Sequence, residues 1–336
     1  MRKKMILLVL TLFIGLSACG NDDKELPDEP GKEQGGNGGD EPENPDNPSG
    51  NEPVSWYVAT TGNDGNSGTL DSPLKSISKA LLRVNPGDTI FLREGAYHEF
   101  VTPTRSGEKG KLITLKSYPG ETAKIDGTGM TIKGWFSALV QLKSVQYMTF
   151  ENLHICNATN SDVNTDPEGV YINGVSRDIT FRNCKVYNIK STCLAGHNNG
   201  DWRSAHAFLV IGDDNGTPIR NLTIEKCEIY DMHTGTSETL TIAGNVDGFT
   251  IQDCEVHDVE NIGIIVAGGD NLNAGGNISV NYARNGVVRR NKVYRCSHQV
   301  SKDFWEGVYN NPAAYGAIGI YVCGGASTII EQNIVW

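Results

Sequence analysis

One short pattern recurs six times along the sequence and constrains the fold more than any other feature. Its third and eighth positions are apolar, and its sixth position is Leu, Cys or Asn. The starts are 27 to 43 residues apart, so a constant core carries insertions of variable length. The copies begin at Met148, Ile179, Leu222, Phe249, Gly286 and Thr328.

A short apolar run precedes the core of each copy, so every repeat predicts three short strands separated by turns. The strands of one repeat can pair only with the same strands of the next, which predicts long parallel sheets. In the apolar runs we expect the side chains of Gln141, Tyr171, Val210, Thr241, Ile265 and Tyr321 to point outward.

The sixth position of the pattern predicts a tight bend whose side chain points into the interior. Cys184, Cys227 and Cys254 occupy this position in successive copies. We therefore expect buried structural thiols there. Seven cysteines follow Cys19, an odd number without zinc-type spacing, and this does not indicate a disulfide framework.

These repeats resemble the right-handed parallel β-helix of pectate lyases and related proteins. Residues 56–99 and 106–127 resemble the opening of extracellular β-helix polysaccharide lyases. The resemblance implies an all-β solenoid over residues 53–336, with a short capping helix at about 74–84. Because the chain stops at Trp336 in the middle of a coil, we expect either a truncated fragment or a coil capped by a partner.

The N-terminal segment predicts export. Residues 1–18 contain a basic start and an apolar stretch, and the segment 16–19 (LSAC) resembles the lipobox of bacterial lipoproteins, which implies lipid on Cys19. A plain secretory signal is the alternative. Residues 19–52 predict a disordered acidic tether. Acidic residues directly after Cys19 resemble the surface-export signal of Bacteroidetes lipoproteins, which places the protein at the outer membrane and cell surface.

The formal net charge is −11, of which −6 remains once residues 1–51 are set aside. This mildly acidic body argues against a nucleic-acid partner. We expect a monomer that binds a polysaccharide, and an acidic polysaccharide needs a cation or a local basic patch.

The lyase resemblance implies calcium-dependent β-elimination of a uronate-containing polysaccharide such as pectate. Calcium binds several oxygen ligands, and carboxylates on successive coils can share one ion. The alternative is a solvated acidic edge. The candidate calcium ligands are Asp213, Asp214, Asp247 and Asp270.

Lyases of this kind often use a lysine base, which makes Lys302 a candidate together with Arg203. Asp231, His233 and Glu238 are expected to stack near His257, Asp258 and Glu260, as an acid/base group or as residues that cap turns. Glu238 with Asp258 is the carboxylate pair of an alternative glycoside hydrolase, and a non-catalytic glycan binder is a third interpretation. Aromatic residues suited to sugar rings, or to pinning their own loops, are Trp202, Trp305, Tyr309, Tyr315, Tyr171 and Tyr321.

Overall fold

The computed structural model describes residues 52–162, 164–193, 204–268, 277–301 and 318–336. All of them except Glu52 belong to the unit Pro53–Trp336. This larger unit is a right-handed parallel β-helix, and the predicted fold class is confirmed.

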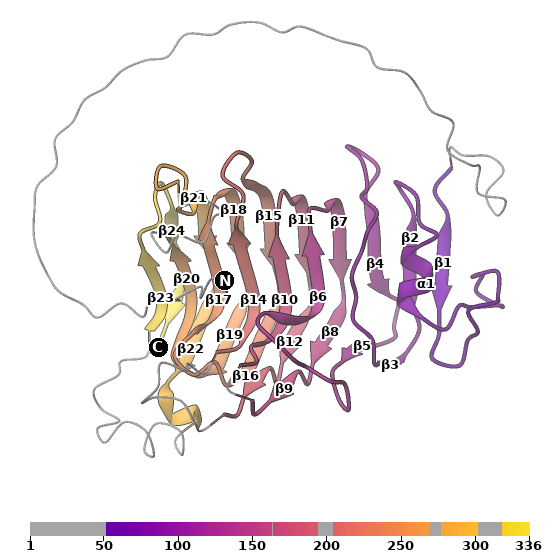
Figure 1. The fold of residues 1–336 in the computed structure, drawn as a ribbon, viewed down its shortest axis with the longest axis horizontal. Helices are drawn as coiled ribbons and strands as arrows, with labels where there is room; N and C mark the ends of the chain where they lie inside the picture. The colour runs from indigo at the N-terminus through magenta and orange to yellow at the C-terminus, as the bar shows by residue number, and fades with distance from the viewer. Residues whose placement is uncertain (1–51, 163, 194–203, 269–276, 302–317) are drawn as a thin grey trace, which may run out of the picture. The chain divides into compact units, whose positions relative to one another are not determined.

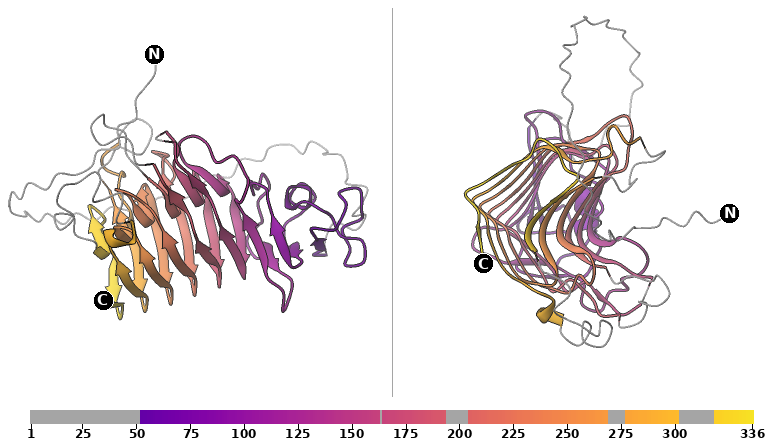
Figure 2. Two further views of the ribbon diagram at one scale, coloured as in Figure 1. Left: turned by 90° about the horizontal axis from the view of Figure 1, so that it is seen from below. Right: turned by 90° about the vertical axis from the view of Figure 1, so that its left-hand side faces the viewer.

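Three long parallel sheets make up the described part of the β-helix (Figure 1 and Figure 2). The first sheet contains β1 (Ser55–Val58), β2 (Thr89–Leu92), β4 (Ile113–Ser117), β7 (Gln146–Glu151), β11 (Arg177–Arg182), β15 (Ile219–Glu225), β18 (Val246–Gln252), β21 (Arg284–Arg289) and β24 (Ile329–Glu331). The second sheet contains β6 (Ser137–Lys143), β10 (Pro167–Asn173), β14 (His206–Gly212), β17 (Glu238–Gly244), β20 (Ile262–Ala267) and β23 (Ile318–Cys323).

The third sheet completes each coil. Its strands are β3 (Gly95–Tyr97), β5 (Ala123–Asp126), β8 (Leu153–Cys156), β12 (Lys185–Tyr187), β16 (Glu228–Met232), β19 (Glu255–Val259), β22 (Lys292–Cys296) and β25 (Ile334–Val335). A small two-stranded sheet pairs β9 (Thr159–Asn160) with β13 (Lys190–Ser191).

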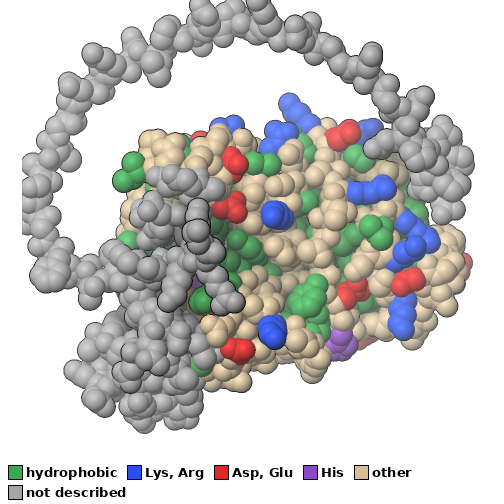
Figure 3. Space-filling model, viewed as in Figure 1, with side chains coloured by type: hydrophobic (Ala, Val, Ile, Leu, Met, Phe, Trp, Pro, Cys, Tyr) green, Lys and Arg blue, Asp and Glu red, His purple; other side chains and the backbone are tan. Residues whose placement is uncertain are grey.

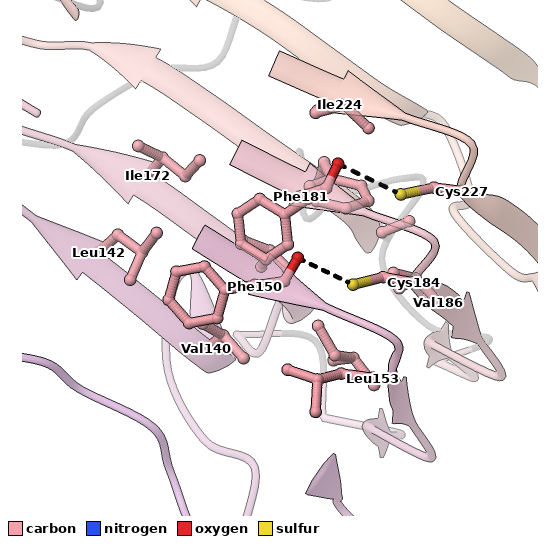
Figure 4. Packing of buried hydrophobic residues seen from close by; sticks show 14 of the residues in the cluster. Val140, Leu142, Phe150, Leu153, Ile172, Phe181, Cys184, Val186, Ile224 and Cys227 are labelled. Carbon is pink, nitrogen blue, oxygen red and sulfur yellow. Dashed lines mark hydrogen bonds between the residues drawn. The ribbon is translucent and has the colours of Figure 1, made fainter. Parts of the chain in front are cut away.

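The core consists of columns of equivalent side chains, as the repeat predicts. Phe150 pairs with Phe181, and Phe181 pairs with Ile224 on the next coil. The rings of Phe150 and Phe181 stack with centroids 4.6 Å apart, in the interior seen in Figure 4. The repeated apolar positions therefore set both the register of the sheets and the packing of the core.

Two turns of the coil need a left-handed backbone, and both fall at fixed positions of the repeat. The fifth position has a φ between 52° and 56° in all six copies, at Asn152, Asn183, Lys226, Asp253, Arg290 and Gln332. The tenth position has a φ between 48° and 64°, at Asn157, Asn188, Asp231, Asp258 and Arg295. Asn and Asp tolerate this conformation better than other residues with side chains, which explains their frequency here.

The three predicted ladder cysteines are buried, and each thiol donates a hydrogen bond to a carbonyl oxygen of the preceding coil. Figure 4 shows two of these bonds, from Cys184 to Phe150 and from Cys227 to Phe181. The ladder continues with Asn291 and Asn333, whose amides donate to Ile251 and Val288. The sixth position is therefore a hydrogen-bonding bend, as predicted.

The capping helix α1 (Ile77–Leu81) is shorter than the predicted span of 74–84. Leu74 instead bonds through its backbone to Tyr57 and Ala59, beside β1, and Leu82 already ends the helix. Ser76 caps its first turn by accepting from the Lys79 amide. A short 3-10 helix, η1 (His298–Ser301), follows β22.

Within the described ranges, no helix has the length and apolar character that crossing a membrane requires.

Candidate functional site

The outward positions of the second sheet were predicted correctly on every strand except β14. Tyr171 pairs with Gln141 on one side and with Leu209 on the other, and Leu209 pairs with Thr241. Leu209 therefore takes the outward position that we expected for Val210, which is buried in the core instead. The run FLVI is apolar at every position, so alternation could not define which residues point outward.

The corrected register brings three ionisable side chains into one column. Glu168 pairs with His206 on the next coil, and the same register places Glu238 beside His206 on the coil after that. Ala138 pairs with Glu168, and Ile262 pairs with Glu238. Both of these apolar residues belong to clusters on the outer face, apart from the core. Glu168, His206 and Glu238, here called the charged column, therefore lie on the outer face of the second sheet.

His206 lies between two carboxylates. Its Nδ1 donates to Glu168, with Oε2 at 3.0 Å and Oε1 at 3.1 Å. Its Nε2 is 3.7 Å from Oε2 of Glu238. Glu168 and His206 are buried, whereas 24% of the Glu238 side chain is exposed. Thr241 steadies Glu238 by donating from Oγ1 at 3.3 Å. Glu238 is therefore the member of the charged column that is partly exposed to solvent.

The electrostatics of the charged column favour a doubly protonated imidazole. Burial alone lowers the pKa of His206, but the charge and hydrogen bonds of Glu168, with Glu238, outweigh it and raise that pKa to about 10. Burial raises the pKa of Glu168, and the nearby imidazole opposes the rise. The result is a cation held between two acidic groups.

Asp166 adds a fourth ionisable group close to the charged column. It is buried, and its Oδ1 has no hydrogen-bond partner. Burial first, and then the charge of Glu168, raises the pKa of Asp166 to about 8. Asp166 is therefore mostly protonated at neutral pH. Groups with pKa values moved apart in this way are typical of acid/base sites.

The predicted calcium ligands make local contacts instead of gathering around a common point. Asp213 accepts from Asn173 and from the Gly174 amide. Asp214 accepts from the amides of Gly216 and Thr217 at 2.9 and 2.7 Å, as a turn-capping residue does.

The third described candidate ligand, Asp247, pairs with Arg284 at 3.3 Å and accepts from Asn285 at 2.7 Å. No group of three or more His, Cys, Asp or Glu side chains is placed to hold a metal ion within the described ranges. The three described candidates therefore do not gather around one point, and the calcium site stays a prediction. Asp270 lies outside the described residues.

His257 and Asp258 do come together, but on the third sheet. His257 Nδ1 is 2.7 Å from Asp258, and its ring stacks between Tyr230 and Tyr294 at centroid distances of 5.4 and 4.9 Å. Asp258 also pairs with Arg295, whose hydrogen bond lowers the pKa of Asp258. The ring occupies a ninth position, which is aromatic in the neighbouring copies, and the carboxylate occupies a left-handed turn.

Glu238 lies in β17 of the second sheet, whereas Asp258 lies in β19 of the third, so the predicted carboxylate pair is divided between two sheets. The backbone of His233 bonds to Ile189 and Ser191, and Glu260 is buried and accepts from the Gly235 amide at 2.7 Å. Of the predicted acid/base group, only Glu238 belongs to the charged column.

The predicted aromatic residues Tyr171 and Tyr321 both lie on the outer face of the second sheet. Tyr171 packs against Phe136 with ring centroids 5.4 Å apart. On the face shown in Figure 3, outside the grey parts, charged side chains are scattered and form no patch of one sign. Predicted residues outside the described ranges are Cys19, Trp202, Arg203, Lys302, Trp305, Tyr309 and Tyr315.

The coiled sheets and the charged column define a β-helix protein with ionisable groups on an outer sheet face. Comparison with protein families gives the particular group. The family described as "Pel9A-like, right handed beta helix region" matches residues 56–259. The chain therefore belongs to the Pel9A-like right-handed β-helix family.

Two relatives share sequence with this chain. The uncharacterized protein YwoF of Bacillus subtilis is 31% identical over 281 residues, which cover 83% of this chain and 55% of YwoF. The pectate lyase PEL9 of Emericella nidulans is 30% identical over 142 residues, which cover 38% of this chain and 33% of PEL9. The chain thus spans about half of the first relative and a third of the second.

The fold also resembles that of a solved glycosidase. The crystal structure of the GH136 lacto-N-biosidase from Eubacterium ramulus matches with a TM-score of 0.63 and 18% identity, over 84% of this chain and 51% of that one. At this identity the match shows a shared fold.

Proposed function

We propose that this protein cleaves glycosidic bonds in a uronate-containing polysaccharide such as pectate, by β-elimination on the outer face of the second sheet. The observation that carries this proposal is the charged column, in which the Glu238 carboxylate is partly exposed and the buried imidazole of His206 lies behind it. Membership of the Pel9A-like family and the likeness to a protein named pectate lyase support the substrate class.

Elimination removes a proton from the carbon beside the uronate carboxylate, so that carboxylate must be neutralised. We propose calcium for this role. The described residues do not form a calcium site, and we derive no step of the reaction from the ion. An esterified uronate is neutral already and needs no cation.

Hydrolysis of a glycosidic bond is a second candidate reaction. The presence of carboxylates on both sides of His206 favours it, because hydrolases commonly use two carboxyl groups. In that reaction Glu238 activates a water molecule in place of a carbon-bound proton. The site on the second sheet is the same for both reactions.

We further propose that lipid on Cys19 anchors the protein at the outer membrane and the cell surface. The basis is the sequence of the segment 16–19 and the acidic tether behind it. Labelling of cells with a fatty-acid analogue tests this: the full chain is expected to take up label and a Cys19→Ser variant to take up none. Equal labelling of both chains contradicts the anchor.

A cleavage assay tests the proposed reaction. The full chain is incubated with pectate, methyl-esterified pectin, alginate or chondroitin, once with added calcium and once with a chelator. Ultraviolet absorbance follows unsaturated products, and a reducing-end assay follows all cleavage. Elimination predicts that both signals rise together, and hydrolysis predicts reducing ends without absorbance. A Glu168→Gln/Glu238→Gln double variant, purified in the same way, is the control for contaminating activity. Silence in both assays, with binding of a substrate, indicates a non-catalytic glycan binder and overturns the proposal.

A further inference from the structure

We infer that Glu238 is the base that takes the substrate's proton, and that His206 and Glu168 are positioning residues acting through it. This assignment rests on the proposed function. It goes further by giving each member of the charged column one role, which follows from burial and from the direction of the contacts.

Accessibility separates the three members. Glu168 is fully buried, His206 is 3% exposed, and 24% of the Glu238 side chain is exposed. A base must come within hydrogen-bond reach of the proton that it removes. Glu238 is the member of the charged column that meets this condition.

The contacts of the imidazole exclude His206 as the base. Nδ1 lies 3.0 Å from Oε2 of Glu168, and Nε2 lies 3.7 Å from Oε2 of Glu238. Each nitrogen faces a carboxylate, so neither nitrogen is turned toward a bound substrate. The ring of His206 therefore orients Glu238 from the buried side, and Thr241 Oγ1 donates to the same carboxylate at 3.3 Å.

Glu168 has the same relation to His206 from the other side. Both of its carboxylate oxygens lie within 3.1 Å of Nδ1, and the side chain has no exposed surface. Glu168 therefore fixes the ring and keeps it charged. Within the described ranges, two further ionisable groups interact with Glu168. The charge of Asp166 acts on both Glu168 and His206, and burial, Asp213 and Glu168 raise the pKa of Tyr171.

An Oε atom of Glu238 takes the proton from the carbon beside the neutralised uronate carboxylate. The electron pair of that C–H bond forms a carbon–carbon double bond, and the bond to the leaving sugar breaks with its pair on oxygen. That oxygen takes a proton from water, and Glu238 then releases its own proton to solvent.

The first test is kinetic. Glu238→Gln is expected to lower kcat by about 100-fold or more, the usual contribution of a positioned base. Glu168→Gln is expected to lower kcat by about 10-fold with KM almost unchanged, and to move the alkaline limb of the pH–rate profile to lower pH, because the imidazole loses its second proton more easily. Glu255→Gln, a carboxylate on the third sheet that accepts from Tyr294, is the matched control.

The second test does not need activity. Nitrogen NMR of histidine-labelled full chain, with the His206 signal assigned from a His206→Gln variant, reports whether both ring nitrogens are protonated. We expect both to stay protonated above pH 8 in the wild type and one to lose its proton in Glu168→Gln. Ordinary titration of His206 near pH 6.5 in the wild type overturns the assignment.

These results separate two kinds of failure. A wild type that cleaves no polysaccharide overturns the proposed function, and the roles that rest on it. A wild type that cleaves while Glu238→Gln keeps more than about a third of kcat overturns the assignment and leaves the function standing.

Discussion

Nδ1 of His206 lies 3.0 Å from Oε2 of Glu168 on the preceding coil, and both residues are buried. A buried imidazole and carboxylate in contact hold a proton that neither keeps so firmly in the unfolded chain. The folding stability is therefore linked to the protonation of this pair.

The pair predicts a loss of stability at alkaline pH. The pKa of His206 is raised from 6.5 in the unfolded chain to about 10 in the folded one. Its contribution to the free energy of unfolding is therefore complete below pH 6.5 and is lost as pH rises toward 10. Asp166, with a pKa raised to about 8, adds a loss in the same direction at lower pH. We expect the free energy of unfolding to keep falling from pH 8 to pH 10, as measured by urea unfolding. A Glu168→Gln/His206→Gln variant is expected to show a shallower fall, and equal slopes contradict the linkage.

The ladder of the sixth position predicts which substitutions the bend accepts. Cys254 donates to the Ile224 carbonyl, and Asn291 above it donates in the same way to Ile251. Cys254→Asn extends the asparagine ladder and is expected to change stability by less than about 1 kcal/mol. Cys254→Val leaves the carbonyl without its donor and is expected to cost about 1–2 kcal/mol. Denaturant midpoints decide this, and an equal cost for both variants contradicts the ladder.

The left-handed turn predicts a stabilising substitution. Lys226 has a φ of 54° at a position where other coils have Asn152 and Asn183. Lys226→Asn is expected to add about 0.5–1 kcal/mol, because asparagine tolerates this conformation better. Lys226→Ala removes the same charge without easing the backbone and is the control. Thermal unfolding in which both variants behave alike counts against this explanation.

Close packing of the first sheet predicts a steric effect at Gly286. A Cβ atom there would lie 2.0 Å from Cζ of Phe249. Gly286→Ala is expected to cost about 1–3 kcal/mol through overpacking. The double variant Phe249→Leu/Gly286→Ala is expected to be less destabilised than the sum of its two single changes. Additive costs in a double-mutant cycle show that the two residues do not interact.

The fold was predictable because its signals repeat. Apolar third and eighth positions recur in every copy. Where one copy departs from the pattern, the other five still define which positions form the core. The bend at Cys184, Cys227 and Cys254 was predictable for the same reason. The capping helix is shorter than predicted because Leu74 pairs with β1, a tertiary contact that helical pattern alone does not reveal.

Glu168 and His206 were not predicted as site residues. They lie three residues before the outward Tyr171 and Leu209, so strict alternation would place them on the inner face of the sheet. Strands buried on both faces carry no alternation, so sequence pattern fixes their register poorly. The sequence makes His257 and Asp258 acid/base candidates. Their repeat positions are instead those of a ring stack and a left-handed turn.

We propose that the second sheet, and not the third, carries the reaction. The most direct measurement compares kcat on the preferred polysaccharide for Glu238→Gln and Asp258→Asn against the full wild-type chain. We expect a loss of about 100-fold or more for Glu238→Gln and a loss at least ten times smaller for Asp258→Asn. The opposite order would place the reaction at the His257–Asp258 turn and not at the charged column.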